Sequence, residues 1–479
     1  MLETVQNWLF AVACVLLILH ELYYSVFQHA TYSRIRRIVN DFRNRRFYRP
    51  WAARPILIPP TQKMMAELSE TRVLSQRAVY ADMFGFRFTI NGLDHNEVNS
   101  RRSRLYSRVL LVQGPAQLPS LYMYLCRNLR AALDVELQGG VPVSPGTVSV
   151  KLAALSERVL SRLMSVWFFG ENLASDMTFR DALLRHPRQI KTCMGAFQLT
   201  PSFLAPLVHA IITQRGKTMQ LIQNKLIDLM TRGVENWDEP TDMKKLTLLY
   251  NLIDASEPRR SYWTPSTLSQ AVLGLWLAAS HQPWVNLHAI LLELCARPTW
   301  QAALRKEALE HQAKLGSAPD PLPLLDSFMR ETARVTSLDR GAIRRKALAD
   351  YTFSSGPFVP AGSTVCVFSH DVSRNASVYP DPEQFDGSRF LNGRSKDAAS
   401  KFADVSEHHL MWGYGSLACP GRHHAEFILK LVVAHILSNY DLRLADPEAR
   451  RWWSWEDFTM PYQSTRVLFS KRQTEAVPS

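Results

Sequence analysis

Residues 412–424 read WGYGSLACPGRHH and place one cysteine, Cys419, immediately before a helical pattern. Gly413 and Gly415 allow positive φ values and let the backbone approach a flat ligand closely. The helical pattern consists of apolar residues at positions 428, 429, 432, 433 and 436. The unpaired N–H groups and the positive dipole end of a helix start favour a thiolate. The stretch therefore predicts a metal-ligating thiolate, with a buried and inert cysteine as the alternative.

The same residues resemble the haem-binding signature of the cytochrome P-450 family, which has an aromatic residue, Gly, Cys and Gly at fixed spacing. Those positions are Trp412, Gly415, Cys419 and Gly421, and the Pro-Gly-Arg after the cysteine is similar to the fungal microsomal branch. The resemblance implies a mainly α cytochrome P-450 fold, a helical core around heme b with a small β region. It also implies that Cys419 is the axial iron ligand, where a thiolate pushes electron density toward bound oxygen and favours O–O cleavage.

Two further stretches agree with this resemblance. Glu331 and Arg334 lie three residues apart in the helical run LLDSFMRETARV and therefore share a face. The segment YPDPEQFDGSRF, residues 379–390, is similar to the family segment whose arginine joins that pair, and Arg389 is the matching residue. The resemblance implies that Glu331, Arg334 and Arg389 form a buried structural triad around the haem.

Arginines near the predicted haem are candidates to bind its propionates, because a guanidinium suits a carboxylate. The family places such an arginine after the Glu331 helix, which makes Arg344 the first choice and Arg345 the alternative. Leu417 stands where the family usually has Arg or His facing a propionate. This propionate contact is therefore either lost or replaced by Arg422 or by one of Arg101, Arg102 and Arg104.

A long buried helix is predicted to begin at Thr264-Pro265 and to run to about Ala296, with a kink at Pro283. The family usually carries an acid–Thr pair there for proton delivery to oxygen. Here His281 and Gln282 occupy those positions, and Ser280 precedes them. Histidine can carry a proton, whereas Gln can position a water molecule but does not titrate. We therefore expect proton delivery through His281 and Gln282, or else through water, the substrate or Ser280, with a satisfied core histidine as the alternative for His281.

The remaining periodicity is mainly helical from about 97 to 255, with breaks at Gly139-Gly140, at 142–146 and at Pro240. Alternating aromatic and β-branched residues predict a strand over Phe84 to Ile90. Short strands are also expected at 365–368 and 466–469, among turns rich in Pro, Asp and Gly.

The N-terminal region predicts membrane attachment. Residues 8–27 read WLFAVACVLLILHELYYSVF and are long enough to span a bilayer, so 1–30 is assigned as a single anchor. A cleaved signal peptide and a surface helix are the alternatives. Residues 31–60 form a basic, Pro-containing linker whose charge should stay on the cytosolic side. Residues 61–479 are assigned as the haem-thiolate catalytic domain, which is expected to face the cytosol from the endoplasmic reticulum membrane.

The composition limits the kinds of partner and the compartment that are expected for this protein. The net charge is +13, and 31–60 alone carries eight Arg and one Asp, which favours a membrane surface over nucleic acid. The six cysteines include no C-x-x-C pair, which argues against a disulfide framework and for a reducing compartment.

The resemblance implies a monooxygenase that inserts one oxygen atom from O₂ into a lipophilic small molecule, in fungal terpenoid, alkaloid or polyketide biosynthesis. Electrons would come from an NADPH-dependent diflavin reductase, and basic residues such as Arg422 and Lys430 are expected to help it dock. Two alternatives remain: a haem-thiolate isomerase or dehydratase that needs no reductase, and a non-catalytic haem-binding protein.

Overall fold

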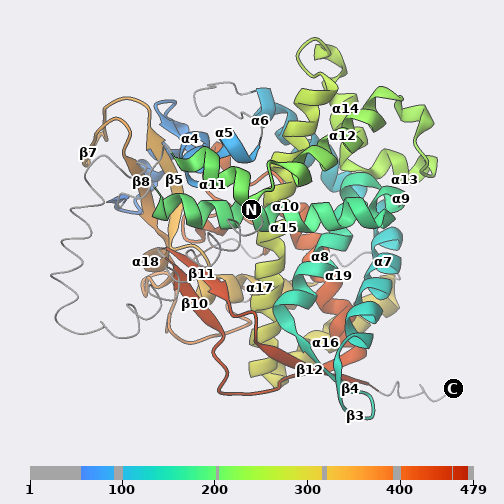
Figure 1. Cartoon of the computed structure of the whole chain (residues 1–479). Coiled ribbons are helices and arrows are strands. Elements are labelled where there is room, and N and C mark those ends of the chain that lie inside the picture. The colour runs from blue at the N-terminus through green and yellow to red at the C-terminus, as the bar shows by residue number, and fades with distance from the viewer. Residues whose placement is uncertain are drawn as a thin grey trace, which may run out of the picture.

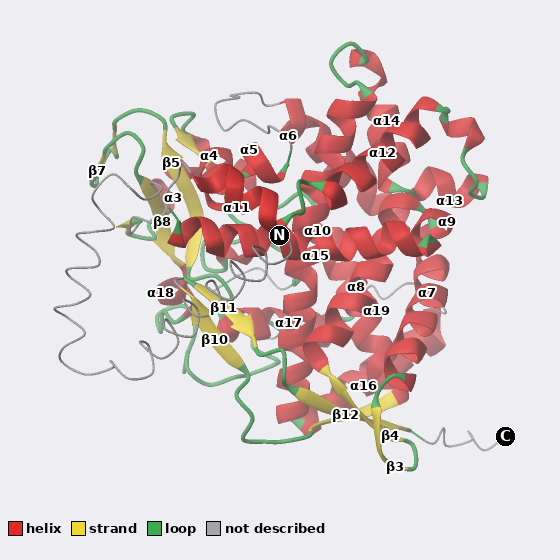
Figure 2. Cartoon of the chain, in the orientation of Figure 1, coloured by secondary structure: helices red, strands yellow, loops and turns green. Residues whose placement is uncertain are grey.

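The computed structural model describes residues 55–90, 101–200, 204–315, 321–391, 397, 401–455 and 457–472. Figure 1 shows a body of packed helices beside a smaller region of strands, and Figure 2 shows that helix dominates. The principal helices of the body are α7 (Leu118–Gln138), α8 (Leu152–Phe169), α10 (Met177–Leu199), α12 (Lys217–Thr231), α15 (Pro265–Ala296), α16 (Pro298–Leu315), α17 (Pro323–Thr336) and α19 (Arg422–Asn439). The predicted mainly helical architecture is confirmed.

Helix α15 runs through the centre of the body, as the unbroken apolar run predicted (Figure 1). Thr264 caps it, because its Oγ1 accepts a hydrogen bond of 3.2 Å from the N–H of Thr267, and Pro265 occupies the first helical position. Pro283 lies inside the helix, where it removes one backbone hydrogen bond. The helix packs against α8, α10, α12, α17 and α19, so it connects most of the helical core.

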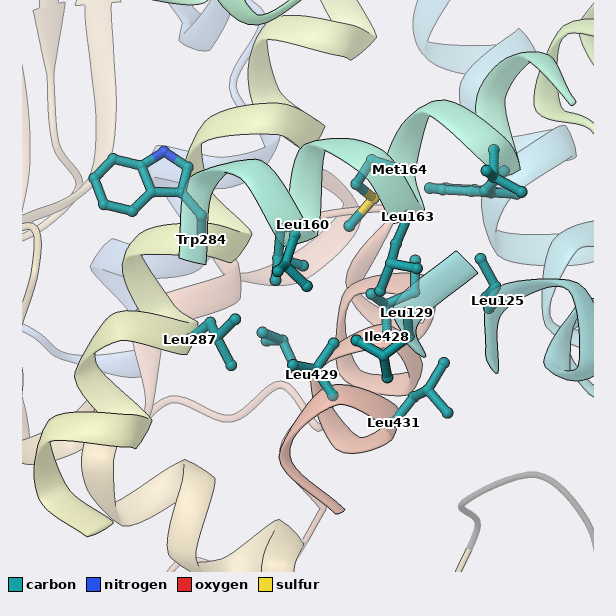
Figure 3. Packing of buried hydrophobic residues seen from close by; sticks show 14 of the residues in the cluster. Leu125, Leu129, Leu160, Leu163, Met164, Trp284, Leu287, Ile428, Leu429 and Leu431 are labelled. Carbon is teal, nitrogen blue, oxygen red and sulfur yellow. The ribbon is translucent and has the colours of Figure 1, made fainter. Parts of the chain in front are cut away.

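The core joins four of these helices in one apolar cluster (Figure 3). Leu125 and Leu129 come from α7, Leu160, Leu163 and Met164 from α8, Trp284 and Leu287 from α15, and Ile428, Leu429 and Leu431 from α19. Burial of one such side chain stabilises the fold by about 1.5–3 kcal/mol. The helix that follows Cys419 is therefore fixed in the core along its apolar face.

Two four-stranded sheets flank the helices. The first has the order β1-β8-β5-β2 and the second β3-β4-β12-β9. The first contains β1 (Ile56–Ile58), β2 (Leu74–Ser75), β5 (Gly341–Ala347) and β8 (Thr364–Phe368), and the second contains β3 (Val141–Ser144), β4 (Thr147–Lys151), β9 (Tyr440–Leu444) and β12 (Arg466–Lys471). The strands predicted at 365–368 and 466–469 are confirmed. The β3–β4 hairpin occupies the break predicted between 139 and 146.

The strand predicted over Phe84 to Ile90 is wrong. Helix α4 (Gln76–Phe84) ends at Gly85, which adopts φ 63°, and a short helix α5 (Phe86–Thr89) follows. The Thr89 hydroxyl donates to the carbonyls of Phe84 and Gly85 at 3.0 and 3.2 Å and closes the turn. Phe84 and Phe86 stack with their ring centroids 5.7 Å apart and pack on an apolar cluster that includes Ile190 and Leu277. Tertiary packing thus buries the alternating aromatics without a sheet.

The apolar segment 8–27 and nearly all of the basic segment 31–60 lie outside the described residues, so the anchor and the linker stay predictions. Within the part of the chain that the structure describes, no helix combines the length and the apolar character needed to cross a membrane.

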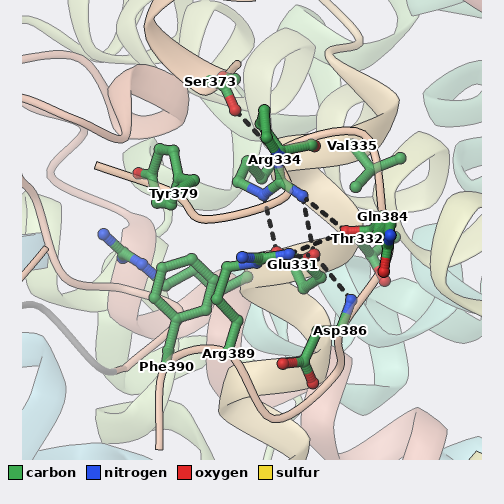
Figure 4. A network of polar contacts seen from close by, with 12 residues as sticks. Glu331, Thr332, Arg334, Val335, Ser373, Tyr379, Gln384, Asp386, Arg389 and Phe390 are labelled. Atoms are coloured by element: carbon green, nitrogen blue, oxygen red, sulfur yellow. Dashed lines mark hydrogen bonds and ion pairs between the residues drawn. The ribbon is translucent and has the colours of Figure 1, made fainter. Parts of the chain in front are cut away.

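A buried network centred on Glu331 ties α17 to the segment that precedes the cysteine loop (Figure 4). Arg334 Nε and Nη2 donate to the two carboxylate oxygens at 2.7 and 2.8 Å, and Arg389 Nε lies 3.1 Å from both oxygens. The backbone N–H of Asp386 donates to the same carboxylate at 2.9 Å. Glu331 and Arg334 are fully buried. The structure therefore brings together the three residues of the predicted triad.

The two arginines also hold main-chain carbonyls. Arg334 Nη1 donates to the carbonyls of Ser373 and Pro382 at 2.8 and 2.7 Å. Arg389 donates to those of Pro380 and Gln384 at 2.6 and 2.8 Å. A segment with little regular structure between 373 and 389 thereby receives fixed hydrogen-bond partners.

We expect Glu331→Gln to destabilise the protein by roughly 3–5 kcal/mol, because two buried arginines would lose their carboxylate partner. Urea unfolding followed by circular dichroism measures this change. Glu310→Gln is the matched control, since Glu310 forms a largely exposed pair with Lys306 at 3.9 Å and should change stability by less than about 0.5 kcal/mol. Equal stability of the two variants would show that the network contributes little.

Candidate active site

The cysteine loop folds back on itself directly before α19. Gly413 and Gly415 have φ values of 84° and 62°, a conformation that side chains disfavour. The Cys419 N–H donates to the Trp412 carbonyl at 2.7 Å and closes the loop. Gly421 is the N-cap of α19, so Cys419 lies three residues before the first helical residue, Arg422. The predicted placement at a helix start is confirmed.

The Cys419 thiol is free and half-buried. Burial raises its pKa, while hydrogen bonds from the N–H groups of Gly421 and Arg422 and the Arg422 charge partly offset that rise. These groups favour the thiolate but do not outweigh desolvation by themselves. A cation bound at the sulfur would complete the stabilisation, since a metal deprotonates the thiol that binds it.

Arg422 turns back onto the loop rather than away from it. Its Nη1 donates to the Cys419 carbonyl at 2.9 Å, and its Nε has no hydrogen-bond partner among the described residues. It also lines a cavity of about 620 Å³ between α3 (Gln62–Glu70) and the loop, together with Lys63 and Tyr414. This cavity is open, so Arg422 can take part in a surface contact beside Cys419.

The prediction that Lys430 is a basic surface residue that helps the reductase to dock is wrong. Its side chain is 2% exposed, and its Nζ lies 2.7 Å from Asp326 and 3.1 Å from Glu426. Lys430 lies one turn along α19 from Glu426, and its ammonium reaches Asp326 of α17. A side chain whose charge is neutralised inside the protein cannot attract an acidic partner.

Arg344 and Arg345, both on β5, are buried but have different partners. Arg344 forms ion pairs with Asp339 and with Asp457, the latter at 3.1 Å. Arg345 donates to the carbonyls of Leu68 and Arg344 at 3.1 and 2.8 Å. Among the described residues it has no carboxylate partner, and burial lowers its pKa to about 10. An acidic group is therefore missing beside Arg345 but not beside Arg344.

Other polar groups near the loop and α15 are also without partners in the described part of the chain. Arg102 belongs to α6 (Arg101–Tyr106), and its buried Nε has no hydrogen-bond partner there. The neighbouring Tyr106 donates to the Ala271 carbonyl at 3.0 Å, which places α6 against α15. The buried Ser69 Oγ also lacks a partner, and Ser69 lies against Gly415 of the loop.

The free side of α15 is a single narrow face. Between Leu268 and Cys295 the exposed residues are Ala278 and Gln282, which are four positions apart and therefore neighbours on the helix surface. Ala278 and Gln282 therefore form one exposed stripe on a helix that is otherwise largely buried. Gln282 thus presents its amide to open space.

His281 lies on a different side of α15. It lines a small cavity with Glu157 of α8 and Lys191 of α10, and this cavity has room for about one water molecule. Its ring centroid is 5.7 Å from that of Trp284, and its Nδ1 has no partner among the described residues. Burial, and then the Lys191 charge, lowers its pKa to about 3. His281 is therefore neutral at physiological pH and does not share the face of Gln282.

These residues fit a haem. Cys419 supplies a thiol at a helix start, and Arg345 and Arg102 supply buried donors that lack an acidic partner in the described chain, as two propionates require. The sequence did not single out Ser69, Asp339, Asp457, Asp326 or Glu426, and it assigned Lys430 to the surface. Contacts with distant segments, such as Arg344 with Asp457 and Lys430 with Asp326, decide their surroundings.

The cytochrome P-450 family model matches residues 144–469, more than half of the chain. The cytochrome P-450 monooxygenase ptmP of Penicillium ochrochloron is 28% identical over 335 residues, which cover 66% of this chain and 73% of that protein. The cytochrome P-450 monooxygenase penP of Penicillium crustosum is 28% identical over 352 residues, covering 70% of this chain and 65%, just under two thirds, of that protein.

Among solved structures, the retinoic acid bound cyanobacterial CYP120A1 matches with a TM-score of 0.64 and 19% identity, covering 85% of this chain and 86% of that one. This likeness shows the fold. The family match and the fungal relatives confirm the expected family and, with it, the expected class of oxidoreductase. The chain belongs to the cytochrome P-450 family.

Proposed function

We propose that the protein is a haem-thiolate monooxygenase that inserts one oxygen atom from O₂ into a C–H or C=C bond of a lipophilic small molecule. The observation that carries this proposal is the position of Cys419, free and half-buried at the start of a core helix, inside the region that matches the family. When bound, the haem supplies the oxygen chemistry, and a thiolate ligand favours O–O cleavage.

The protein's own residues bind and orient the haem. Cys419 holds the iron, and the N–H groups of Gly421 and Arg422 support its negative charge. Arg345 and Arg102 hold the propionates, and Arg345 takes precedence over Arg344 because Asp339 and Asp457 already neutralise Arg344. Leu417 contributes no such contact.

Proton delivery is assigned to the Gln282 face of α15. Gln282 positions a water molecule on the exposed stripe, and His281 takes a secondary part from its separate cavity, where it is neutral. Ser280, whose buried Oγ lacks a partner in the described chain, borders the same cavity as His281. Glu157, whose carboxylate pairs with the exposed Arg188, lines this cavity as well.

The substrate and partners follow from the relatives and the sequence. The fungal relatives favour a secondary metabolite such as a terpenoid, alkaloid or polyketide intermediate. The apolar segment 8–27 would hold the protein in the endoplasmic reticulum membrane with the catalytic domain in the cytosol. An NADPH-dependent diflavin reductase would supply electrons and dock near the cavity lined by Lys63 and Arg422.

A second candidate is a haem-thiolate isomerase or dehydratase that works without a reductase. It is favoured by one observation, that the side chain on the exposed face of α15 is Gln282, which does not titrate.

The carbon monoxide difference spectrum of the reduced protein tests the ligand. We expect a thiolate-type Soret band in the wild type and its loss in Cys419→Ala, because no other described cysteine lies at this loop. Cys126→Ala is the matched control and should keep the band, since Cys126 lies on α7. An unchanged spectrum in Cys419→Ala would refute the assigned ligand and the proposed function.

Haem affinity tests the choice between the two arginines. We expect Arg345→Leu to weaken haem binding by roughly tenfold, the factor that corresponds to about 1.4 kcal/mol, since a charge-assisted contact to a propionate would be lost. Arg344→Leu should weaken it less and mainly lower stability. Rates of haem transfer to apomyoglobin measure the difference, and a larger effect of Arg344→Leu would restore Arg344 as the propionate partner.

Reductase-driven turnover tests the α15 residues. We expect Gln282→Leu to lower product formation per NADPH by roughly tenfold or more, because the water-positioning amide is lost, and His281→Phe to lower it less. Product yield, NADPH consumption and hydrogen peroxide release are measured together. Turnover that continues without NADPH and reductase would instead support the isomerase or dehydratase.

A further inference from the structure

A buried group of three charged side chains joins α17 to α19. Lys430 Nζ lies 2.7 Å from Asp326 Oδ2 and 3.1 Å from Glu426 Oε1. Asp326, Glu426 and Lys430 are 3%, 8% and 2% exposed. Two carboxylates thus face one ammonium, and full ionisation would leave one negative charge in excess away from water, which is strongly unfavourable.

A proton shared between the carboxylates removes that excess charge. Glu426 hydrogen-bonds with Asp326, and burial followed by this hydrogen bond raises the pKa of Glu426 to about 8, against the partial offset of Lys430. At neutral pH the group therefore holds one carboxyl, one carboxylate and one ammonium, and its net charge is zero. Loss of the proton would place two carboxylates in contact.

The surroundings supply little further compensation. Glu307 of α16 is a further acid that interacts with Asp326 and Lys430, and its carboxylate accepts hydrogen bonds from the N–H groups of Leu324 and Leu325 at the start of α17. The other charged groups packed against α19 and α17 have separate partners: His423 faces Asp404 and Lys401, His435 faces Arg130 and Asp134, and Arg330 pairs with Asp397.

The group is connected to the cysteine loop by three successive hydrogen bonds. Asp326 Oδ1 accepts the N–H of Phe402 at 3.1 Å. The Phe402 carbonyl accepts the indole N–H of Trp412 at 2.7 Å, and the two rings meet edge to face with centroids 5.4 Å apart. The Trp412 carbonyl accepts the Cys419 N–H at 2.7 Å. These contacts link Asp326 through Phe402 and Trp412 to the backbone of Cys419.

We propose that Asp326, Glu426 and Lys430 are positioning residues for Cys419, and that loss of their shared proton at alkaline pH loosens the loop that carries the thiolate. The expected change in the haem spectrum rests on the proposed haem function, whereas the expected loosening of the loop does not. Because the pKa of Glu426 is raised in the folded protein, its contribution is present at lower pH and is lost as pH rises through about 8. Acid would protonate the Cys419 thiolate directly. Measurements at alkaline pH therefore report on Asp326, Glu426 and Lys430 rather than on the thiolate.

The test uses the full chain, with and without haem, from about pH 6 to about pH 10. We expect amide hydrogen exchange in peptides spanning 402–419, corrected for the intrinsic effect of pH, to lose protection with a midpoint near pH 8 in the wild type. The thiolate-type band of the carbon monoxide complex should fall by half at the same pH. Glu426→Gln, which mimics the protonated carboxyl, should abolish both transitions.

Asp326→Asn is the second variant, since its Oδ1 can still accept from Phe402 while one carboxylate charge is removed. Glu310→Gln on the exposed face of α16 is the matched control and should keep the wild-type midpoint. Far-UV circular dichroism at each pH separates loosening of the loop from global unfolding.

Flat wild-type exchange across this range, or an unshifted midpoint in Glu426→Gln and Asp326→Asn, overturns the proposal. An exchange transition in a protein that binds no haem would refute the haem function and leave the network standing.

Discussion

One buried carboxylate, that of Glu331, holds together the part of the chain that frames the cysteine loop. It accepts hydrogen bonds from Arg334, Arg389 and the N–H of Asp386, and the two guanidiniums then hold main-chain carbonyls between 373 and 384. That segment has little regular structure and no large apolar cluster of its own, so charge-assisted hydrogen bonds replace the ladder that a sheet would provide. The cysteine loop begins about twenty residues after Arg389, so the chain that leads to it starts from a segment that this network holds in place.

The loop itself depends on two kinds of support. On one side, α19 is held by apolar contacts with α7, α8 and α15, which fix the helix start near Cys419 (Figure 3). On the other side, hydrogen bonds run from Asp326 through Phe402 and Trp412 to the Cys419 N–H. Apolar packing sets the position of the helix, and the polar path sets the orientation of the thiolate. A haem-thiolate enzyme needs both, because the sulfur must stay charged in a largely apolar site.

Some polar groups near the cysteine loop have charged partners in the described chain and others have none. The groups without such partners indicate where the haem would lie. Arg344 already pairs with Asp339 and Asp457, and Lys430 already faces two acids. By contrast, Arg345 has main-chain carbonyls alone, and Arg102 Nε, Arg422 Nε and Ser69 Oγ have no hydrogen-bond partner in the described chain. Buried donors without acceptors are rare in folded proteins, so those beside the cysteine loop and α15 fit an acidic ligand there.

The sequence by itself determined that Cys419 stands before a helix, and it determined that helix and the capped central helix from Thr264. These features are marked by local signals: glycines that need positive φ, a Thr-Pro helix start and an apolar stripe. The Glu331 triad was predicted from the resemblance to the family, because a charged pair three residues apart is common on protein surfaces. Only the tertiary structure decided that Phe84 to Ile90 is helical, that Lys430 is buried, that Arg345 rather than Arg344 lacks an acid, and that His281 and Gln282 face different sides. These outcomes depend on side chains from distant segments, such as Asp326 beside Lys430 and Lys191 beside His281. Local pattern fixes which residues can form an element, whereas burial and charge pairing across the fold fix which face each one presents.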